Sequence, residues 1–186
     1  SAHAYASVWS EQGSPLLAIS QAQHQRLAEV MGPDIRVELA MRYGRPAIAD
    51  GLEALRRAGA RRILVLPLYP QYSATTTASV FDTVTAEIRR WRWIPELRFV
   101  NQYHDDTGYI QALADSVQAF QEANGRPDQL IMSFHGLPQA YCEAGDPYYC
   151  HCQKTARLLA ERLRLSSADY RVTFQSRLGV KAWLKP

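Results

Sequence analysis

Short apolar runs alternate with longer amphipathic segments along the whole chain. The runs predict β-strands, and the segments between them have the apolar spacing of helices. The predicted strands are 35–41, 62–68, 97–103, 129–135 and 170–176, and the predicted helices are 16–31, 48–59, 76–91, 110–124 and 154–165. Strands separated by helices form parallel βαβ units with right-handed crossovers. The sequence therefore predicts an α/β fold of parallel sheets flanked by helices.

Composition narrows the class of protein. The chain has 186 residues, of which 47% are hydrophobic, so it can bury a core. A net charge of +3 is too small to indicate a nucleic-acid partner. The densest basic group is Arg56, Arg57, Arg61 and Arg62. We interpret it as a solvated helix end, and the alternative is a surface that binds an anion or a membrane. No apolar run approaches the roughly 20 residues needed to cross a bilayer.

Three segments that follow predicted strands carry unusual chemistry. They are 67–77, 133–138 and 174–179, and each combines hydroxyl or amide side chains with Gly or Pro. In open parallel sheets, ligands bind beyond the carboxyl ends of the strands. The three segments are therefore expected to form one ligand site.

His135 is the strongest single candidate for a functional residue. It ends a predicted buried strand, and Gly136 and Pro138 then shape a sharp, stiff exit. An imidazole at this place can exchange protons near neutral pH or bind a metal. The alternative is an ordinary hydrogen-bonded histidine. In the 67–77 segment, Tyr69 and Tyr72 suit a flat apolar ligand.

Cys142, Cys150 and Cys152 lie within eleven positions, with His151 between the last two. The odd number and the clustering argue against a disulfide framework and favour a reducing compartment. The spacing is not that of a zinc finger. Two interpretations remain, which are reduced thiols without a ligand, or ligation of a metal or iron–sulfur cluster that takes a fourth ligand from His151 or from outside the chain.

Several long blocks resemble the ferrochelatases, most closely the bacterial branch. These blocks are VLPLYPQYSATTTASVFD (65–82), SFHGLPQAYCEAGDPYYC (133–150) and TFQSRLGVKAWLKP (173–186), joined by GSPLLAISQAQHQRL (13–27) and MRYGRPAI (41–48). The resemblance covers almost the whole chain, in order.

The resemblance implies two α/β lobes with a porphyrin in the cleft between them. Residues 1–105 would be the remainder of the N-terminal lobe, and 106–186 the first part of the C-terminal lobe. The implied activity is insertion of Fe(II) into protoporphyrin IX or coproporphyrin III in haem biosynthesis, a lyase reaction. His135 would be the catalytic and metal-binding residue. The residues that would line the porphyrin site are Gln71, Tyr72, Ser73, Ser133, Gln175, Ser176 and Trp183.

The chain also departs from the family pattern. The family's first strand with its loop, and the later segment that carries the glutamate partner of the histidine, have no counterpart. The 186 residues alone are therefore expected to be catalytically incomplete. Glu143 and Asp146 are interpreted as turn formers rather than as that carboxylate. Some family members hold a [2Fe-2S] cluster, but their usual cysteine pattern does not match Cys142, Cys150 and Cys152 directly.

Two other functions stay open at this stage. One is a different tetrapyrrole chelatase, for cobalt or sirohydrochlorin, and the other is a non-catalytic tetrapyrrole- or metal-binding module. The expected partners are a porphyrin and ferrous iron, without nucleic acid. The expected location is the cytoplasm, with peripheral association with the inner membrane as an extension. The sequence distinguishes neither between the two porphyrins nor between oligomeric states.

Overall fold

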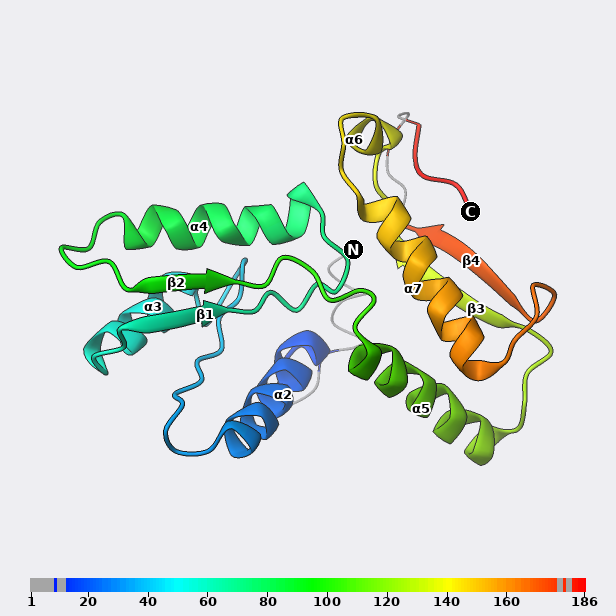
Figure 1. The fold of residues 1–186 in the computed structure, drawn as a ribbon, viewed down its shortest axis with the longest axis horizontal. Helices are drawn as coiled ribbons and strands as arrows, with labels where there is room; N and C mark the ends of the chain where they lie inside the picture. Colours follow the sequence, from blue (N-terminus) through cyan, green and yellow to red (C-terminus); the bar gives the residue numbers. More distant parts are fainter. Residues whose placement is uncertain (1–8, 10–12, 177–178, 180–181) are drawn as a thin grey trace. The chain divides into compact units, whose positions relative to one another are not determined.

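The structure is a computed structural model that describes residues 9, 13–176, 179 and 182–186 of the chain. Helices and strands alternate along most of it, as Figure 1 shows. The elements in chain order are α2 (Pro15–Met31), α3 (Ile48–Arg57), β1 (Arg62–Val65), η1 (Ala74–Ala78), α4 (Ser79–Ile88), β2 (Glu96–Phe99), α5 (Thr107–Asn124), β3 (Leu130–His135), α6 (Gln139–Glu143), α7 (Tyr148–Leu163) and β4 (Tyr170–Gln175).

The chain forms two compact units. The first contains residues 1–63 and 81–98, and the second contains residues 64–80 and 99–186. In the first unit, Ser14 begins α2 by accepting a hydrogen bond from the Leu17 N–H at 3.2 Å. Helix α3 buries Ile48 and Leu52 on one face. The candidate functional residues lie in the second unit.

The strands pair in parallel within two small sheets. In the first sheet, β2 bonds to β1 in one direction along both strands, because Glu96 N–H donates to Arg61 O and Val100 N–H to Val65 O. In the second sheet, β3 and β4 are parallel, with a register that runs from Leu130 opposite Tyr170 to His135 opposite Gln175. The carboxyl ends of β3 and β4 therefore lie at the same edge.

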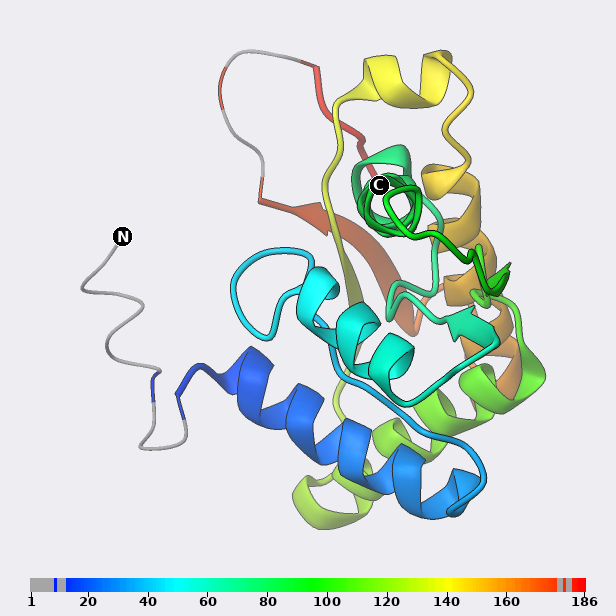
Figure 2. The same ribbon diagram turned by 90° about the vertical axis from the view of Figure 1, so that its left-hand side faces the viewer.

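Helix α7 covers one face of the β3–β4 sheet, and α5 packs beside α7 (Figures 1 and 2). Met132 points from β3 into a buried cluster with Ala156, Leu159 and Ala160 of α7 and Ala114 of α5. Small alanine side chains at these positions let the helices approach the sheet closely. The residues before and after Met132, which are Ile131 and Ser133, are exposed on the other face.

The structure confirms the α/β class with parallel strands and changes several element boundaries. The segment 35–41, expected as a strand, forms no ladder of hydrogen bonds among the described residues. Its one bridge is from Met41 to Ala47. The strand expected at 62–68 ends at Val65, two residues before Pro67, which has no N–H to donate. Helix α7 begins at Tyr148, six residues earlier than expected, and α6 was not predicted.

Candidate active site

The end of β3 places His135 on the open face of its sheet. His135 is exposed, and so is Ser133 two residues before it, because alternate side chains of a strand share one face. Gln175 lies opposite His135 on β4 and is exposed as well. The Gly136 N–H donates to Gln175 O at 2.7 Å, so the pairing of the two chains continues one residue beyond β3.

The chain after His135 runs beside the segment that contains Trp183. Pro138 forms an antiparallel bridge with Trp183. On either side of this bridge, Leu184 N–H donates to Leu137 O and Gln139 N–H donates to Ala182 O, each at 2.9 Å. Leu137 and Leu184 are buried with Phe174 and Cys152. This pairing brings two of the family-like blocks, near His135 and near Trp183, into contact.

The third block, around Gln71–Ser73, is fixed to helix α7. The Gln71 side-chain amide donates to the Thr155 hydroxyl at 3.0 Å, and that hydroxyl donates to His104 O at 2.8 Å. The Tyr72 N–H donates to His151 Nδ1 at 3.2 Å. Gln71 and Ser73 are buried, and Tyr72 is half-buried. Gln71 and Ser73 thus hold the loop in place, and Tyr72 is the member of this group whose side chain remains partly accessible.

Asp146 joins this loop to the start of α7. Its Oδ2 accepts from the Ser73 hydroxyl at 2.9 Å and from the Ala74 N–H at 2.8 Å. Its Oδ1 accepts from the Tyr148 N–H at 3.0 Å. One carboxylate therefore occupies the N-terminal ends of both η1 and α7, where free N–H groups favour a negative charge.

Tyr148 continues the connection to β3. Its phenol oxygen lies near the backbone of His135 and the Cys152 thiol. Burial raises the pKa of Tyr148 well above its usual range. The phenol is therefore neutral at ordinary pH. Its role here is to support the packing between α7 and β3 and not to act as a base.

A pair of stacked histidines lies behind the loop. The rings of His104 and His151 are 3.7 Å apart at their centroids, with 9° between their planes. Desolvation by burial lowers the pKa of both rings. Both are therefore neutral at pH 7, which leaves His151 Nδ1 able to accept the Tyr72 N–H. The neighbouring Asp105 carboxylate pairs with the Lys154 ammonium group.

The three cysteines occupy different environments. Cys142 is half-buried, Cys150 is exposed and Cys152 is fully buried. Burial raises the pKa of Cys152 to about 12 and that of Cys142 above its usual value. Metal ligands must be thiolates, which a raised pKa disfavours. Within the described part of the chain, no group of three or more His, Cys, Asp or Glu side chains could hold a metal ion.

The predicted site residues thus fall into three groups. His135, Ser133 and Gln175 share the open face of β3–β4; Gln71, Tyr72 and Ser73 lie on the loop bound to α7; and Trp183 borders the exit from β3. Ser176 follows β4 with φ of 64°, in the left-handed region. Part of the predicted 174–179 segment, at 177–178, lies outside the described residues.

Sequence reasoning missed His104, Tyr148 and Thr155 among the residues that connect these groups. It named Asp146 only as a turn former and His151 only as a possible metal ligand. A signal existed for His104, because it directly follows the predicted strand at 97–103 and so occupies the same kind of strand-end position as His135. No comparable signal marked Asp146, since an Asp between Gly and Pro is an ordinary turn residue.

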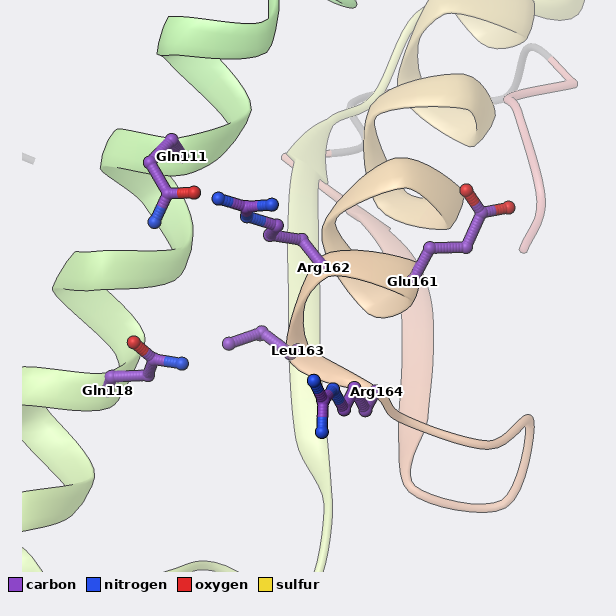
Figure 3. A pocket seen from close by; sticks show the side chains of 6 residues that line it. All are labelled: Gln111, Gln118, Glu161, Arg162, Leu163 and Arg164. Carbon is purple, nitrogen blue, oxygen red and sulfur yellow. The ribbon is translucent and has the colours of Figure 1, made fainter.

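A separate pocket of about 510 Å³ lies between α5 and the end of α7 (Figure 3). It is lined by Gln111, Gln118, Glu161, Arg162, Leu163 and Arg164, with the Arg162 side chain directed toward α5. None of these residues belongs to the candidate site.

Among the described residues, no helix has the length and apolar character needed to traverse a membrane.

Comparisons with known proteins agree on one family. The family model for ferrochelatase matches residues 1–186. The chain is 57% identical to the ferrochelatase of Thioalkalivibrio sulfidiphilus over 190 residues and 51% identical to that of Nitrosococcus oceani over 188, in each case over all of this chain. It spans 52% and 51% of those two proteins, which is about half the length of the curated relatives it matches.

Among solved structures, SirB from Bacillus subtilis with Fe3+ has a similar fold. The TM-score is 0.65 at 16% sequence identity, and the match covers 90% of this chain and 63% of that one. At this identity the likeness concerns the fold alone. The match over the whole chain and the identities above 50% place the chain in a family: it belongs to the ferrochelatases.

Proposed function

We propose that this chain carries part of the active site of an enzyme that inserts Fe(II) into a porphyrin in haem biosynthesis. The observation that carries the proposal is the exposed position of His135 at the end of β3, with Ser133 and Gln175 on the same open face. Membership of the ferrochelatase family supports it. Fe(II) and the porphyrin are both substrates in this reaction.

The chemistry requires a base, a wall and an entry route for iron. A porphyrin must lose two pyrrole protons while the iron exchanges its own ligands. In the proposal, the His135 imidazole receives protons from the pyrrole nitrogens or presents the metal to them. The exposed neighbours Ser133 and Gln175 supply hydroxyl and amide groups beside it.

Tyr72 and Trp183 are the proposed porphyrin-contacting aromatics. Both are half-buried, so each has one part packed in the protein and one part accessible. A flat ring held against such side chains can be bent, which exposes the nitrogen lone pairs on one side. Gln71 and Ser73, whose polar atoms are bonded within the protein, shape this wall rather than bind the ring through those atoms.

Other parts of the proposal follow the family pattern. Residues 1–105 and 106–186 are proposed to belong to different lobes, in line with the two separate sheets. The carboxylate that would act opposite His135 is proposed to lie outside this chain.

We place the reaction in the cytoplasm with peripheral binding to the inner membrane, which fractionation at low and high salt would test. A [2Fe-2S] cluster on Cys142, Cys150 and Cys152 finds no support among the described residues.

The test is a metal-insertion assay on two proteins. One is the 186-residue chain, and the other is a chimera in which it replaces the matching half of the Thioalkalivibrio sulfidiphilus ferrochelatase, to which it is 57% identical. We expect Fe(II) insertion by the chimera, under anaerobic conditions, and none by the chain alone. A chimera that binds porphyrin without inserting iron would favour a binding module. Preference for Co(II) or for sirohydrochlorin would favour another chelatase.

A further inference from the structure

We propose that Asp146 is a positioning residue that sets the distance between the porphyrin-contacting loop and the strand end that carries His135. The proposal rests on the function proposed above for these two segments. It assigns to Asp146 a role in the reaction that differs both from an ordinary turn residue and from a carboxylate that touches the substrate.

The Asp146 side chain bonds to donors on two separate segments. The Asp146 carboxylate accepts three hydrogen bonds, of 2.9, 2.8 and 3.0 Å, from the Ser73 hydroxyl, the Ala74 N–H and the Tyr148 N–H. Two of these donors are on the loop and one is at the start of α7. A neutral amide could not replace it fully, because one of its two polar atoms is a donor.

Ser73 and Asp146 are both held by further hydrogen bonds. Ser73 is fully buried, and its hydroxyl accepts from the Thr75 N–H at 3.2 Å. Because a carboxylate can only accept, the Ser73 hydroxyl is the donor in its bond to Asp146. Asp146 is itself fixed, since its backbone N–H donates to Tyr141 O at 3.0 Å. Hydrogen bonds to a charged acceptor between groups held in this way are among the stronger ones in proteins.

Tyr148 lies between Asp146 and His135. Tyr148 donates its N–H to Asp146, and its phenol oxygen lies near the backbone of His135. The route from Tyr72 through Ser73 and Asp146 to Tyr148 therefore consists of successive bonds, and the Tyr148 phenol then lies beside the His135 backbone. Loss of Asp146 would release the loop on one side and the start of α7 on the other. Small displacements of a binding wall from a reacting group have large effects on rate.

The experiment compares Asp146→Ala with Glu143→Ala in the chimera. Glu143 is a matched control because it lies three residues before Asp146, at the end of α6, is exposed, and among the described residues its side chain accepts from the Gln139 amide. We expect Asp146→Ala to raise the KM for the porphyrin about 10-fold, the effect of a lost charge-assisted bond, and to leave the KM for Fe(II) unchanged. Glu143→Ala should leave both KM values within about twofold of the parent.

A purely structural role predicts a different pattern. Partial unfolding lowers the apparent kcat through loss of active protein and leaves both KM values as they were, so this result would overturn the proposal. Ser73→Ala combined with Asp146→Ala gives a second criterion, since two groups that share one bond should show strongly non-additive effects on the porphyrin KM. Additive effects would contradict the proposal. A parent chimera that inserts no iron would refute the proposed function instead.

The isolated chain provides a readout that needs no activity. The Ala74 and Tyr148 amides donate to Asp146, so Asp146→Ala should reduce their protection from hydrogen exchange by at least tenfold while the Met132 amide in β3 keeps its protection. Unchanged protection of Ala74 and Tyr148 would show that the carboxylate does not fix the loop, and the positioning role would fail whatever the chimera does.

Discussion

The imidazole rings of His104 and His151 stack in parallel, with 3.7 Å between their centroids, directly behind the loop that holds Tyr72. His104 is only 3% exposed, and among the described residues its Nδ1 makes no hydrogen bond, with Asp105 Oδ1 3.9 Å away. His151 Nδ1 accepts from the Tyr72 N–H. The loop proposed to contact the porphyrin is thus held in part by a bond that exists only while His151 is unprotonated at Nδ1.

The pair should make the attachment of this loop sensitive to acid. Burial lowers the pKa of both rings from the usual value of 6.5, so below pH 6.5 the unfolded chain binds more protons than the folded one. The contribution of the two histidines to the free energy of unfolding is therefore fully present above pH 6.5. It is lost as the pH falls from 6.5 toward their lowered pKa values. Asp105 and Asp146 oppose the shift of His151, and Lys154 adds to it. We expect the protection factor of the Tyr72 amide to fall between pH 7 and pH 5.

His104→Phe tests the origin of this acid sensitivity. Phenylalanine keeps a flat ring against His151 and removes the titrating nitrogens, including the unpartnered Nδ1. The variant should therefore show a smaller loss of Tyr72 protection over the same pH range. His24→Gln, on α2, is the control and should behave like the parent. An equal pH dependence in all three proteins would mean that other groups control the loop.

His135→Ala should remove most of the activity of the chimera. The loss of one acid–base group costs about 100-fold or more in rate. Because His135 is exposed at a strand end, the substitution should leave the fold intact, as measured by circular dichroism. His24→Ala is the matched control and should keep full Fe(II) insertion. Near-normal turnover by His135→Ala would show that the base lies elsewhere.

Much of this architecture could be predicted from local pattern. Helices α2 and α5 have strong start and stop residues, Ser14 and Gly32 for the one and Asp106 and Gly125 for the other, and both were predicted within a few residues. The prediction of a strand at 35–41 was wrong. A strand needs a hydrogen-bonded neighbour, and the spacing of apolar residues does not reveal whether one is present. The early start of α7 was missed because Pro147 and the tyrosines after it resemble a loop.

The sequence indicates the two ends of the proposed site but not the bonds that connect them. Strand-end chemistry pointed to His135 and to the loop at Gln71–Ser73 as separate features. The bonds that join them, from Asp146 to Ser73 and from Gln71 to Thr155, link residues 73 and 84 positions apart. Contacts of that sequence separation leave no periodic trace. The fold places an ordinary turn aspartate between two segments of the proposed site.

The three cysteines should differ sharply in reactivity and in their contribution to stability. Cys150 is exposed and should react with a thiol reagent in the folded chain, whereas buried Cys152 should react only after unfolding. Cys152→Ser places a hydroxyl among Leu137, Phe174 and Leu184 and should lower the free energy of unfolding by about 1–3 kcal/mol. Cys150→Ser should change it by less than about 0.5 kcal/mol.

Iron and sulfide analysis completes the cysteine test. The environments of these thiols predict that anaerobically purified chain contains neither acid-labile sulfide nor bound iron, and has no visible absorbance. Iron and sulfide in equal amounts, lost together in the triple serine variant, would instead establish a cluster on these residues and contradict our interpretation of the thiols.

Ile131 should control self-association of the isolated chain. Within the described residues, each sheet has two strands, so each strand leaves one edge without a ladder partner. Such edges pair with other chains, and a charged side chain on the edge strand suppresses this.

Ile131, on β3, is 63% exposed, and Phe120, on α5, is 64% exposed. Both lose a similar apolar surface on replacement by Lys, but only Ile131→Lys places the charge on an edge strand. Light scattering should therefore show association of the parent chain and of Phe120→Lys, and a marked reduction for Ile131→Lys. Equal reduction by both substitutions would assign the association to exposed apolar surface in general rather than to strand pairing.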